Sequence, residues 1–348
     1  MSGIFQNREL SRRGFLQSSA HTALAASTIS STLWAEEQNK SKREPESNVE
    51  RLFNSMTVGQ KKIVCFDWNH KDPQRGLLRT FIANNWNITR PEVKSDFYTP
   101  EQQAMIREIF EGIIQPDWHA RFDKQLEDDA GGFGQDQSIA IFGDPASDQF
   151  EFVLTGRHMT LRCDGNSAPH VAFGGPIFYG HAASGFDEEA DHPGNVFWPQ
   201  AIAANRVASM LSGRQREQAL LPHSPEESAV GFGAAGAERP GLPVEELSKD
   251  QREEMEKVLT TLIEPYRQVD QQEVRSCLKA QGGLDACHLA FYRDGDVGED
   301  EVWDNWRLEG PAFVWHYRGA PHVHVWVNVA DDPAVQMNSK NLSGQLRP

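Results

Sequence analysis

The sequence is poor in cysteine, in basic residues and in long apolar runs. Only 4 cysteines occur in 348 residues, which excludes a small domain held together mainly by disulfides. No apolar run is long enough for a polytopic membrane protein, and the mean hydropathy is -0.57. Lys and Arg number 34 against 50 Asp and Glu. The resulting net charge of -16 repels phosphate backbones, so we expect no nucleic-acid partner.

Several motifs of common enzyme classes are also absent. The sequence has no G-x-S-x-G, no H-E-x-x-H, no cysteine–histidine nucleophile pattern and no glycine-rich phosphate loop. These absences weaken the serine hydrolase, zincin and thiol-protease interpretations. We also see no internal repeat. With 39% hydrophobic residues the chain is long enough to bury a large core, and we expect one large domain.

The N-terminus resembles an export signal. Ser11-Arg12-Arg13-Gly14-Phe15-Leu16 precedes a weakly apolar stretch that is rich in Ala, Ser and Thr. We predict a twin-arginine signal peptide over residues 1–35, the twin-arginine export machinery as partner, and a periplasmic or extracellular protein with no membrane span after cleavage. The alternative is an amphipathic N-terminal helix that contains Arg-Arg by chance. A polar linker (36–48), the domain (49–335) and a C-terminal tail (336–348) follow.

Periodicity predicts a mixture of helices and strands without regular βαβ alternation. Helices are expected from Thr99 to Ile114, after Asn195, and from Pro243 to Tyr266. Strands are expected over 138–143, 150–163, 288–293, 313–317 and 322–329, with a bulge at Gly156. We expect loops over 164–196 and 222–242. The fold class is therefore α+β, with a mixed, mostly antiparallel sheet and helices packed on one side.

The most distinctive local pattern is His322-Val323-His324-Val325-Trp326-Val327-Asn328-Val329. Strict alternation places the valines on one face of a strand and His322, His324 and Trp326 on the other. Two histidines on one face of a strand are close enough to bind one metal ion. The opposing strand leaves one question open. If 318–321 is a loop with paired ends, His316 lies on the valine side, whereas a shift of one residue brings it to the histidine side.

A third ligand has to come from elsewhere in the chain. His158 is the best source because it follows the expected bulge at Gly156, and His181 is the next, at the start of a glycine-rich loop. Three imidazoles suit a single Cu, Zn or Fe ion. Arg157 and Tyr292 are candidates for orienting a small substrate. Cys277 and Cys287 are the first choice for a disulfide in an oxidising compartment.

Five segments together resemble, in order, domain-of-unknown-function family 3500 over about residues 65–330. They are Phe152-Val153-Leu154-Thr155-Gly156-Arg157-His158-Met159-Thr160-Leu161, Pro176-Ile177-Phe178-Tyr179-Gly180, Tyr292-Arg293, Gly310-Pro311 and His322-Val323-His324. The resemblance implies an exported protein and supports His158, His322 and His324 as one set, but it implies no reaction.

The residues and the resemblance lead to one expectation and one alternative. The first is an exported metalloprotein that oxidises or hydrolyses a small substrate at a histidine-bound transition metal. The alternative is a non-enzymatic periplasmic protein that binds a ligand or a partner at the same face.

Overall fold

The computed structural model describes residues 45–183, 191, 192, 194–233, 237–298, 300 and 302–335, which form one compact unit. The expected signal peptide and C-terminal tail lie outside these residues. The expected linker ends earlier than predicted, because helix α2 already begins at Pro45. No helix in the described ranges has the length and apolar character needed to cross a membrane.

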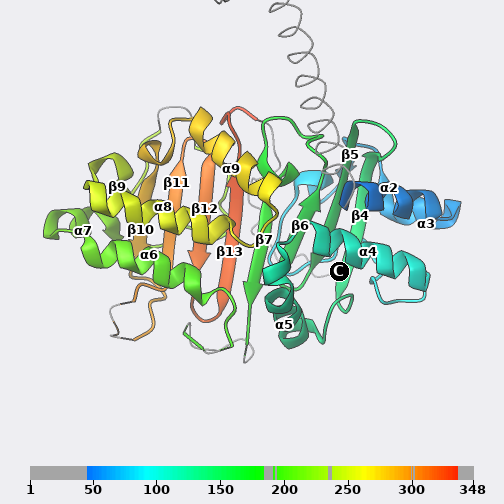
Figure 1. Ribbon diagram of the computed structural model, residues 1–348, viewed down its shortest axis with the longest axis horizontal. Coiled ribbons are helices and arrows are strands. Elements are labelled where there is room, and N and C mark those ends of the chain that lie inside the picture. Colours follow the sequence, from blue (N-terminus) through cyan, green and yellow to red (C-terminus); the bar gives the residue numbers. More distant parts are fainter. Residues whose placement is uncertain are drawn as a thin grey trace, which may run out of the picture. The chain divides into compact units, whose positions relative to one another are not determined.

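The centre of the molecule is one mixed sheet of eleven strands, mostly antiparallel (Figure 1). Its order is β1-β4-β5-β6-β7-β13-β12-β11-β10-β8, with β9 paired to β10. The strands are β1 (Cys65–Phe66), β4 (Gln137–Asp144), β5 (Gln149–Gly156), β6 (Met159–Cys163), β7 (Ile177–His181), β8 (Leu220–Leu221), β9 (Leu242–Pro243), β10 (His288–Tyr292), β11 (Asn305–Gly310), β12 (Phe313–Arg318) and β13 (Val323–Val329). The short strands β2 (Lys71–Asp72) and β3 (Gly76–Leu77) form a separate pair.

The α-helices lie over one face of this sheet, as expected (Figure 1). They are α2 (Pro45–Ser55), α3 (Val58–Val64), α4 (Pro100–Gly112), α5 (His119–Ala130), α6 (Trp198–Met210), α7 (Gly213–Ala219), α8 (Lys249–Ile263) and α9 (Gln268–Ala280). Their apolar sides and the valines of β13 belong to one continuous core. The α+β prediction with a mostly antiparallel sheet is therefore confirmed.

The fold contains an internal repeat that we did not predict. Counted inwards from each edge, the strands of the sheet are equivalent. The order β1-β4-β5-β6-β7 on one side corresponds to β8-β10-β11-β12-β13 on the other. The helix pairs α2–α3 and α4–α5 of the first copy correspond to α6–α7 and α8–α9 of the second. An approximate twofold axis passes between Ile177 and Val327, which pair across the two central strands.

Hydrogen bonds confirm the equivalence of the two copies. In the first, Gln60 and Gln102 close the capping boxes of α3 and α4, and the two side chains bond to each other at 2.8 Å. In the second, Gln215 and Gln251 do the same for α7 and α8, at 3.0 Å. The segments that join each helix pair also bond symmetrically, from Gln115 N to Pro265 O and from Arg267 N to Ile113 O.

Several expected elements differ from the observed ones. The strand predicted over 150–163 is a hairpin, because the chain reverses at Arg157-His158 rather than bulging at Gly156. A Cβ on Gly156 would lie 2.6 Å from the carbonyl oxygen of Asp136, so close packing explains this glycine. The loop predicted over 164–196 contains strand β7. The helix predicted from Pro243 begins only at Lys249, since Pro243 belongs to β9.

The register between β12 and β13 follows the shifted alternative. Arg318 pairs with His324 and His316 pairs with Trp326, so His316 lies on the histidine face. Of the two alternatives left open by the sequence, the one with His316 beside Val323 is therefore excluded. The loop between the paired residues Arg318 and His324 spans 319–323, one residue longer than the loop considered over 318–321.

The sheet face opposite the helices is covered by two irregular segments. Residues around Leu78, Phe81 and Trp86 cover the first copy. In the second copy, Val230 packs against Phe178, Val314 and Trp326. We call residues 222–233 the covering segment, since among the described residues it has no helix or strand. It brings further side chains onto the face that carries the histidines.

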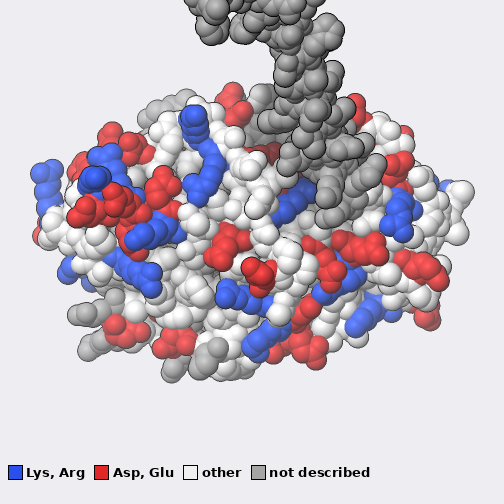
Figure 2. All heavy atoms as spheres, in the orientation of Figure 1, with Lys and Arg blue, Asp and Glu red and all other residues white. Residues whose placement is uncertain are grey.

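All four cysteines are free, so the expected Cys277–Cys287 disulfide is wrong. Both thiols are buried, and Cys287 makes a long contact with the carbonyl of Gly283 instead. On the helix-covered face, acidic and basic side chains are interspersed and no large patch of one sign stands out (Figure 2).

Candidate metal centre

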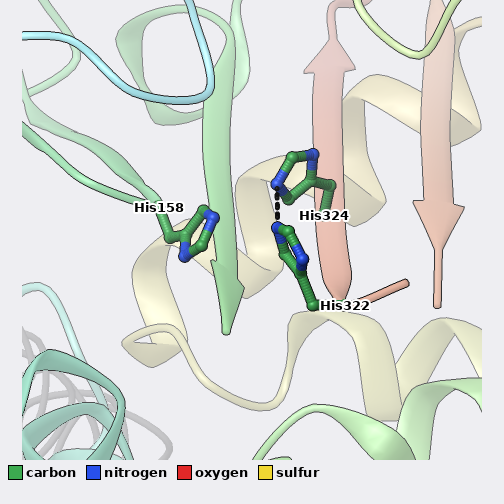
Figure 3. Close-up of side chains that lie close together, drawn as sticks. All are labelled: His158, His322 and His324. Atoms are coloured by element: carbon green, nitrogen blue, oxygen red, sulfur yellow. Dashed lines mark hydrogen bonds between the residues drawn. The ribbon is translucent and has the colours of Figure 1, made fainter. Parts of the chain in front are cut away.

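Three of the four predicted histidine ligands converge. His158, His322 and His324 each offer a ring nitrogen, and these atoms all lie within 4.8 Å of one another. The rings are only 3–5% exposed. His158 comes from the turn beside β7, whereas His322 and His324 project toward it from the start of β13 (Figure 3). The group therefore joins the two copies of the repeat across the centre of the sheet.

The backbone fixes His158 in an unusual conformation. Its φ of 55° lies in the left-handed region that residues other than glycine rarely adopt. The Asn84 carbonyl accepts the His158 N–H, and the His158 carbonyl accepts the N–H of Gly180 on β7. These two bonds hold the turn against the central strand, so the strained residue presents its ring toward β13.

Two carboxylates orient the imidazoles from outside the group. Asp129, at the end of α5, lies 2.9 Å from Nδ1 of His158, and Glu227 of the covering segment lies 2.9 Å from Nδ1 of His324. Each carboxylate is held in turn, Asp129 by Gln125 and Ala182, and Glu227 by Trp326. A carboxylate at Nδ1 fixes the tautomer and leaves Nε2 for a metal, as is usual for metal-binding histidines.

The electrostatics favour a neutral His324 ring beside a charged Glu227 carboxylate. Burial lowers the pKa of His324 to about 3, although Glu227 opposes this shift. Burial alone would raise the pKa of Glu227 and of Asp129, but the histidines and other donors outweigh it, so both pKa values lie below their usual range. Neutral imidazole is the form that binds metal.

Three imidazoles are a donor set of the kind that binds one transition-metal ion. Nε2 of His322 and Nε2 of His324 lie 3.0 Å apart, close to the roughly 3.3 Å expected for two nitrogens bound at 2.0–2.1 Å in a tetrahedral site. A site with three histidines keeps a coordination position for water or substrate. The aromatic ring of Phe178 packs edge-on against His324, which shields one side.

His181, the fourth predicted ligand, does not belong to the group. Its cross-strand partner is Val323, so its ring lies on the helix-covered face of the sheet. Both ring nitrogens are engaged there, Nε2 with Asp128 at 2.9 Å and Nδ1 as acceptor from the N–H of Val196. The residue ends strand β7 instead of opening a loop, which explains the wrong prediction.

The structure separates the two candidates for substrate orientation. Arg157 lies beside His158 in the β5–β6 turn, where its backbone forms an isolated bridge with Asn85. Tyr292 ends β10, three strands away from β13, at a distance of roughly 14 Å for strands about 4.8 Å apart. His316 shares the face of His324 but lies outside the group of three.

Comparison with known proteins identifies the family. The family described as "Protein of unknown function (DUF3500)" matches residues 38–328 of the chain. The chain belongs to the DUF3500 family. No curated protein and no solved structure matches it. Membership of DUF3500 confirms the resemblance noted from the motifs and carries no reaction, so the chemistry has to be argued from the site.

Asp129 and Glu227 contact the candidate metal group and were not predicted from the sequence. Asp129 is one of two adjacent aspartates at the end of a helix, and Glu227 is one of two adjacent glutamates in a Pro-rich segment. Acidic pairs in such places are usually solvated, so neither position carried a signal of its own.

Proposed function

We propose that this protein is an exported metalloprotein in which His158, His322 and His324 bind one transition metal, Cu, Zn or Fe, that oxidises or hydrolyses a small substrate. The observation that carries the proposal is the convergence of three buried imidazoles within 4.8 Å. The carboxylates on His158 and His324 support it, because they leave Nε2 of each ring for a metal.

The metal would supply a Lewis acid or a redox couple at its open position. The chain's own residues would bind and orient. Asp129 and Glu227 would hold two of the rings, and Arg157, next to His158, would pair with an anionic or carbonyl group of the substrate. The burial of the site would limit water around the reacting atoms.

Metal analysis of the purified protein tests the proposal. We expect about one ion per chain in the wild type and less than about a tenth of that in His322→Ala/His324→Ala and in His158→Ala. His181→Gln is the matched control, since His181 is equally buried but lies outside the group, and it should keep its metal. Negligible metal in the wild type, before and after incubation with Zn²⁺, Cu²⁺ and Fe²⁺, would refute the metal site.

Reconstitution with Co²⁺ gives a second measurement. Cobalt in a tetrahedral three-histidine site absorbs visible light, so its spectrum reports the geometry directly. We expect one saturable set of absorption bands that disappears in His158→Ala. A spectrum of octahedral, water-bound Co²⁺ in the wild type would contradict the site.

Export by the twin-arginine route is the other part of the proposal. It rests on Ser11-Arg12-Arg13-Gly14-Phe15-Leu16 and on the low hydrophobicity of the stretch that follows. Arg12→Lys/Arg13→Lys should retain the protein in the cytoplasm of a bacterial host, as measured by cell fractionation. Equal export of both proteins would argue for another route.

The burial of the histidines also favours a second function, a ligand-binding protein without chemistry. Their exposure of 3–5% leaves little room for exchange of substrate and product. Such a protein would bind its ligand saturably after chelation of all metal, which distinguishes it from the metalloenzyme.

A further inference from the structure

A second group of polar side chains lies on the same sheet face, and one polar atom of each of its three members lacks a hydrogen-bond partner among the described residues. The hydroxyl of Tyr292, Nη1 of Arg307 and Nδ1 of His316 are buried and have no hydrogen-bond partner among the described residues. Tyr292 and His316 are 1% exposed and Arg307 is 5% exposed. An unpaired polar group costs roughly 1–3 kcal/mol when it is buried, so three of them in one place require an explanation.

The three residues are neighbours on adjacent strands. Arg307 of β11 pairs directly with His316 of β12, and Ala290, two residues before Tyr292 on β10, pairs with Arg307. All three side chains therefore share one face of the sheet. The ring centroids of Tyr292 and His316 lie 6.2 Å apart. We call these residues the Tyr292 cluster.

The guanidinium of Arg307 is fixed in place by its other nitrogens. Nε donates to Glu309 and Nη2 donates to the carbonyl of Ala229 in the covering segment, both at 2.7 Å. Nη1 is the donor that remains. The side chain of Glu309 is 17% exposed against 6% for Arg307, so water screens the carboxylate more than the guanidinium.

All three unpaired atoms can donate a hydrogen bond. Burial raises the pKa of Tyr292 to about 12, so its hydroxyl keeps the proton. Burial and the charge of Arg307 lower the pKa of His316 to about 3, so the ring is neutral and its Nδ1–H tautomer is a donor. Arg307 can only donate, and the hydroxyl and the imidazole can donate beside it, so the three atoms fit a ligand that accepts hydrogen bonds.

The internal repeat provides a comparison within the same molecule. The hairpin registers place Phe142, Val153 and Arg162 of the first copy at the positions of Tyr292, Arg307 and His316. Of the three residues of the first copy, only Arg162 is charged, and all three of its guanidinium nitrogens are engaged. It donates to Glu151 and to the backbone carbonyls of Pro176, Arg79 and Phe81. At equivalent positions of the fold, the polar group of the first copy thus has hydrogen-bond partners within the protein, whereas three polar atoms of the second copy lack them among the described residues.

We propose that Tyr292, Arg307 and His316 form a buried binding site for a small oxyanion, specifically the carboxylate of a small organic acid. The guanidinium would pair with one carboxylate oxygen, and the hydroxyl and the imidazole would donate to the other. Arg318 and Glu227, which form an ion pair beside His324, lie between this site and the metal centre. The oxyanion site does not require the metal, so the test of this site is independent of the proposed function.

Acetate and formate are the probes, added to the full chain after removal of metal by chelation. Saturation-transfer NMR, at constant ionic strength set with chloride, measures their affinity. We expect saturable binding of acetate in the wild type and at least about tenfold weaker binding in Tyr292→Phe and Arg307→Gln, corresponding to one lost charge-assisted hydrogen bond. Binding should persist in His322→Ala/His324→Ala.

Tyr98→Phe is the matched control, because Tyr98 is 2% exposed and its hydroxyl is also unpaired, but it lies far away in the sequence and outside this sheet face. It should bind acetate as the wild type does. If Arg307→Gln fails to fold, Tyr292→Phe still tests the site, since it removes only one oxygen. Absence of saturable acetate and formate binding in the wild type, or equal binding in Tyr292→Phe, would overturn the proposal and leave buried water as the partner of these donors.

Discussion

Asp129 and Glu227 decide which nitrogen each neighbouring histidine presents. Each accepts a hydrogen bond from Nδ1 at 2.9 Å, and each comes from a different part of the chain, a helix end and an irregular segment. Because the rings are buried, little water is available to move a proton from one ring nitrogen to the other. The two carboxylates are therefore positioning residues for any metal bound at Nε2.

Neutralising either carboxylate should weaken metal binding without removing a ligand. We expect Asp129→Asn and Glu227→Gln each to lower the affinity for Zn²⁺ by about 10- to 100-fold. Competition with a chromogenic chelator measures this. Glu226→Gln is the control, since Glu226 is an exposed neighbour of Glu227. Unchanged affinity in both variants would show that the carboxylates serve only the fold.

A pH dependence is predicted at two other buried carboxyls. Burial raises the pKa of Asp164 to about 7 and that of Glu273 to about 8. When folding raises the pKa of a carboxyl, the folded state is favoured while the group is protonated. The contribution of these two carboxyls to the free energy of unfolding is therefore full below about pH 4, and it is lost as the pH rises through 7 and 8. We expect the free energy of unfolding to fall by several kcal/mol between pH 5 and pH 9, because one unit of pKa shift corresponds to about 1.4 kcal/mol.

Glu273→Gln tests this directly. The amide oxygen can still accept the N–H of Phe173, which Glu273 accepts at 3.0 Å, but the group no longer titrates. Urea denaturation at pH 5, 7 and 9 should show a smaller loss of stability in the variant than in the wild type. Parallel losses in both proteins would place the pH dependence elsewhere.

At the scale of elements, the capping boxes tie each short helix to a longer one. Gln102 is 2% exposed and also donates to the carbonyl of Ser55, while Gln251, at 5%, donates to the carbonyl of Met210. The two glutamines thus perform the same task in the two copies. Each satisfies backbone groups at two helix ends at once.

Removing either glutamine should destabilise the protein to a similar extent. We expect Gln102→Ala and Gln251→Ala each to lower the free energy of unfolding by about 2 kcal/mol, because each leaves buried backbone groups unpaired. Gln272→Ala, on an exposed position of α9, should change it by less than about 0.5 kcal/mol. Chemical denaturation measures all three. A large difference between the first two would mean that the copies are not energetically equivalent.

The sequence predicts long elements with clear periodicity better than short or paired ones. The alternation in 322–329 predicts β13 and its two faces, and the capping signal at Thr99 predicts α4. The reversal at Arg157-His158 is missed, because glycine inside an apolar run is compatible with a bulge as well as a turn. Four S/T-x-x-Q segments, starting at Thr57, Thr99, Ser212 and Ser248, mark the repeat, but four-residue motifs are too common to reveal it alone.

The candidate site could be predicted only in part, for a physical reason. His322 and His324 follow from local alternation, and His158 from its position after Gly156. Asp129, Glu227 and the Tyr292 cluster depend on which strands and segments become neighbours in space. That depends on the sheet order and on the register between β12 and β13, which local patterns do not determine.

At the scale of the whole molecule, the metal group depends on both copies of the repeat. His158 belongs to the first copy, and His322 and His324 belong to the second. The central pair β7–β13 and the bonds of Gln115 and Arg267 hold the copies together. Among the described residues, neither copy alone contains a group of three histidines that could hold a metal.

Separately produced halves should therefore fail to bind metal stoichiometrically. We expect residues 1–190 and 191–348, expressed as two chains, to bind less than about a tenth of an ion each, and to recover about one ion per pair when they are co-expressed. Metal analysis and co-purification measure this. Stoichiometric binding by one half would show that the ligands are not those proposed.

The division of the ligands between the copies also orders events in time. His158 is followed by nearly half of the chain before His322 is reached. A ribosome has therefore made β4 to β12 before the second and third ligands exist, and the copies must dock before all three meet. Loading with metal would therefore follow the synthesis of His324 and the docking of the two copies, so a loaded protein is one whose copies have met.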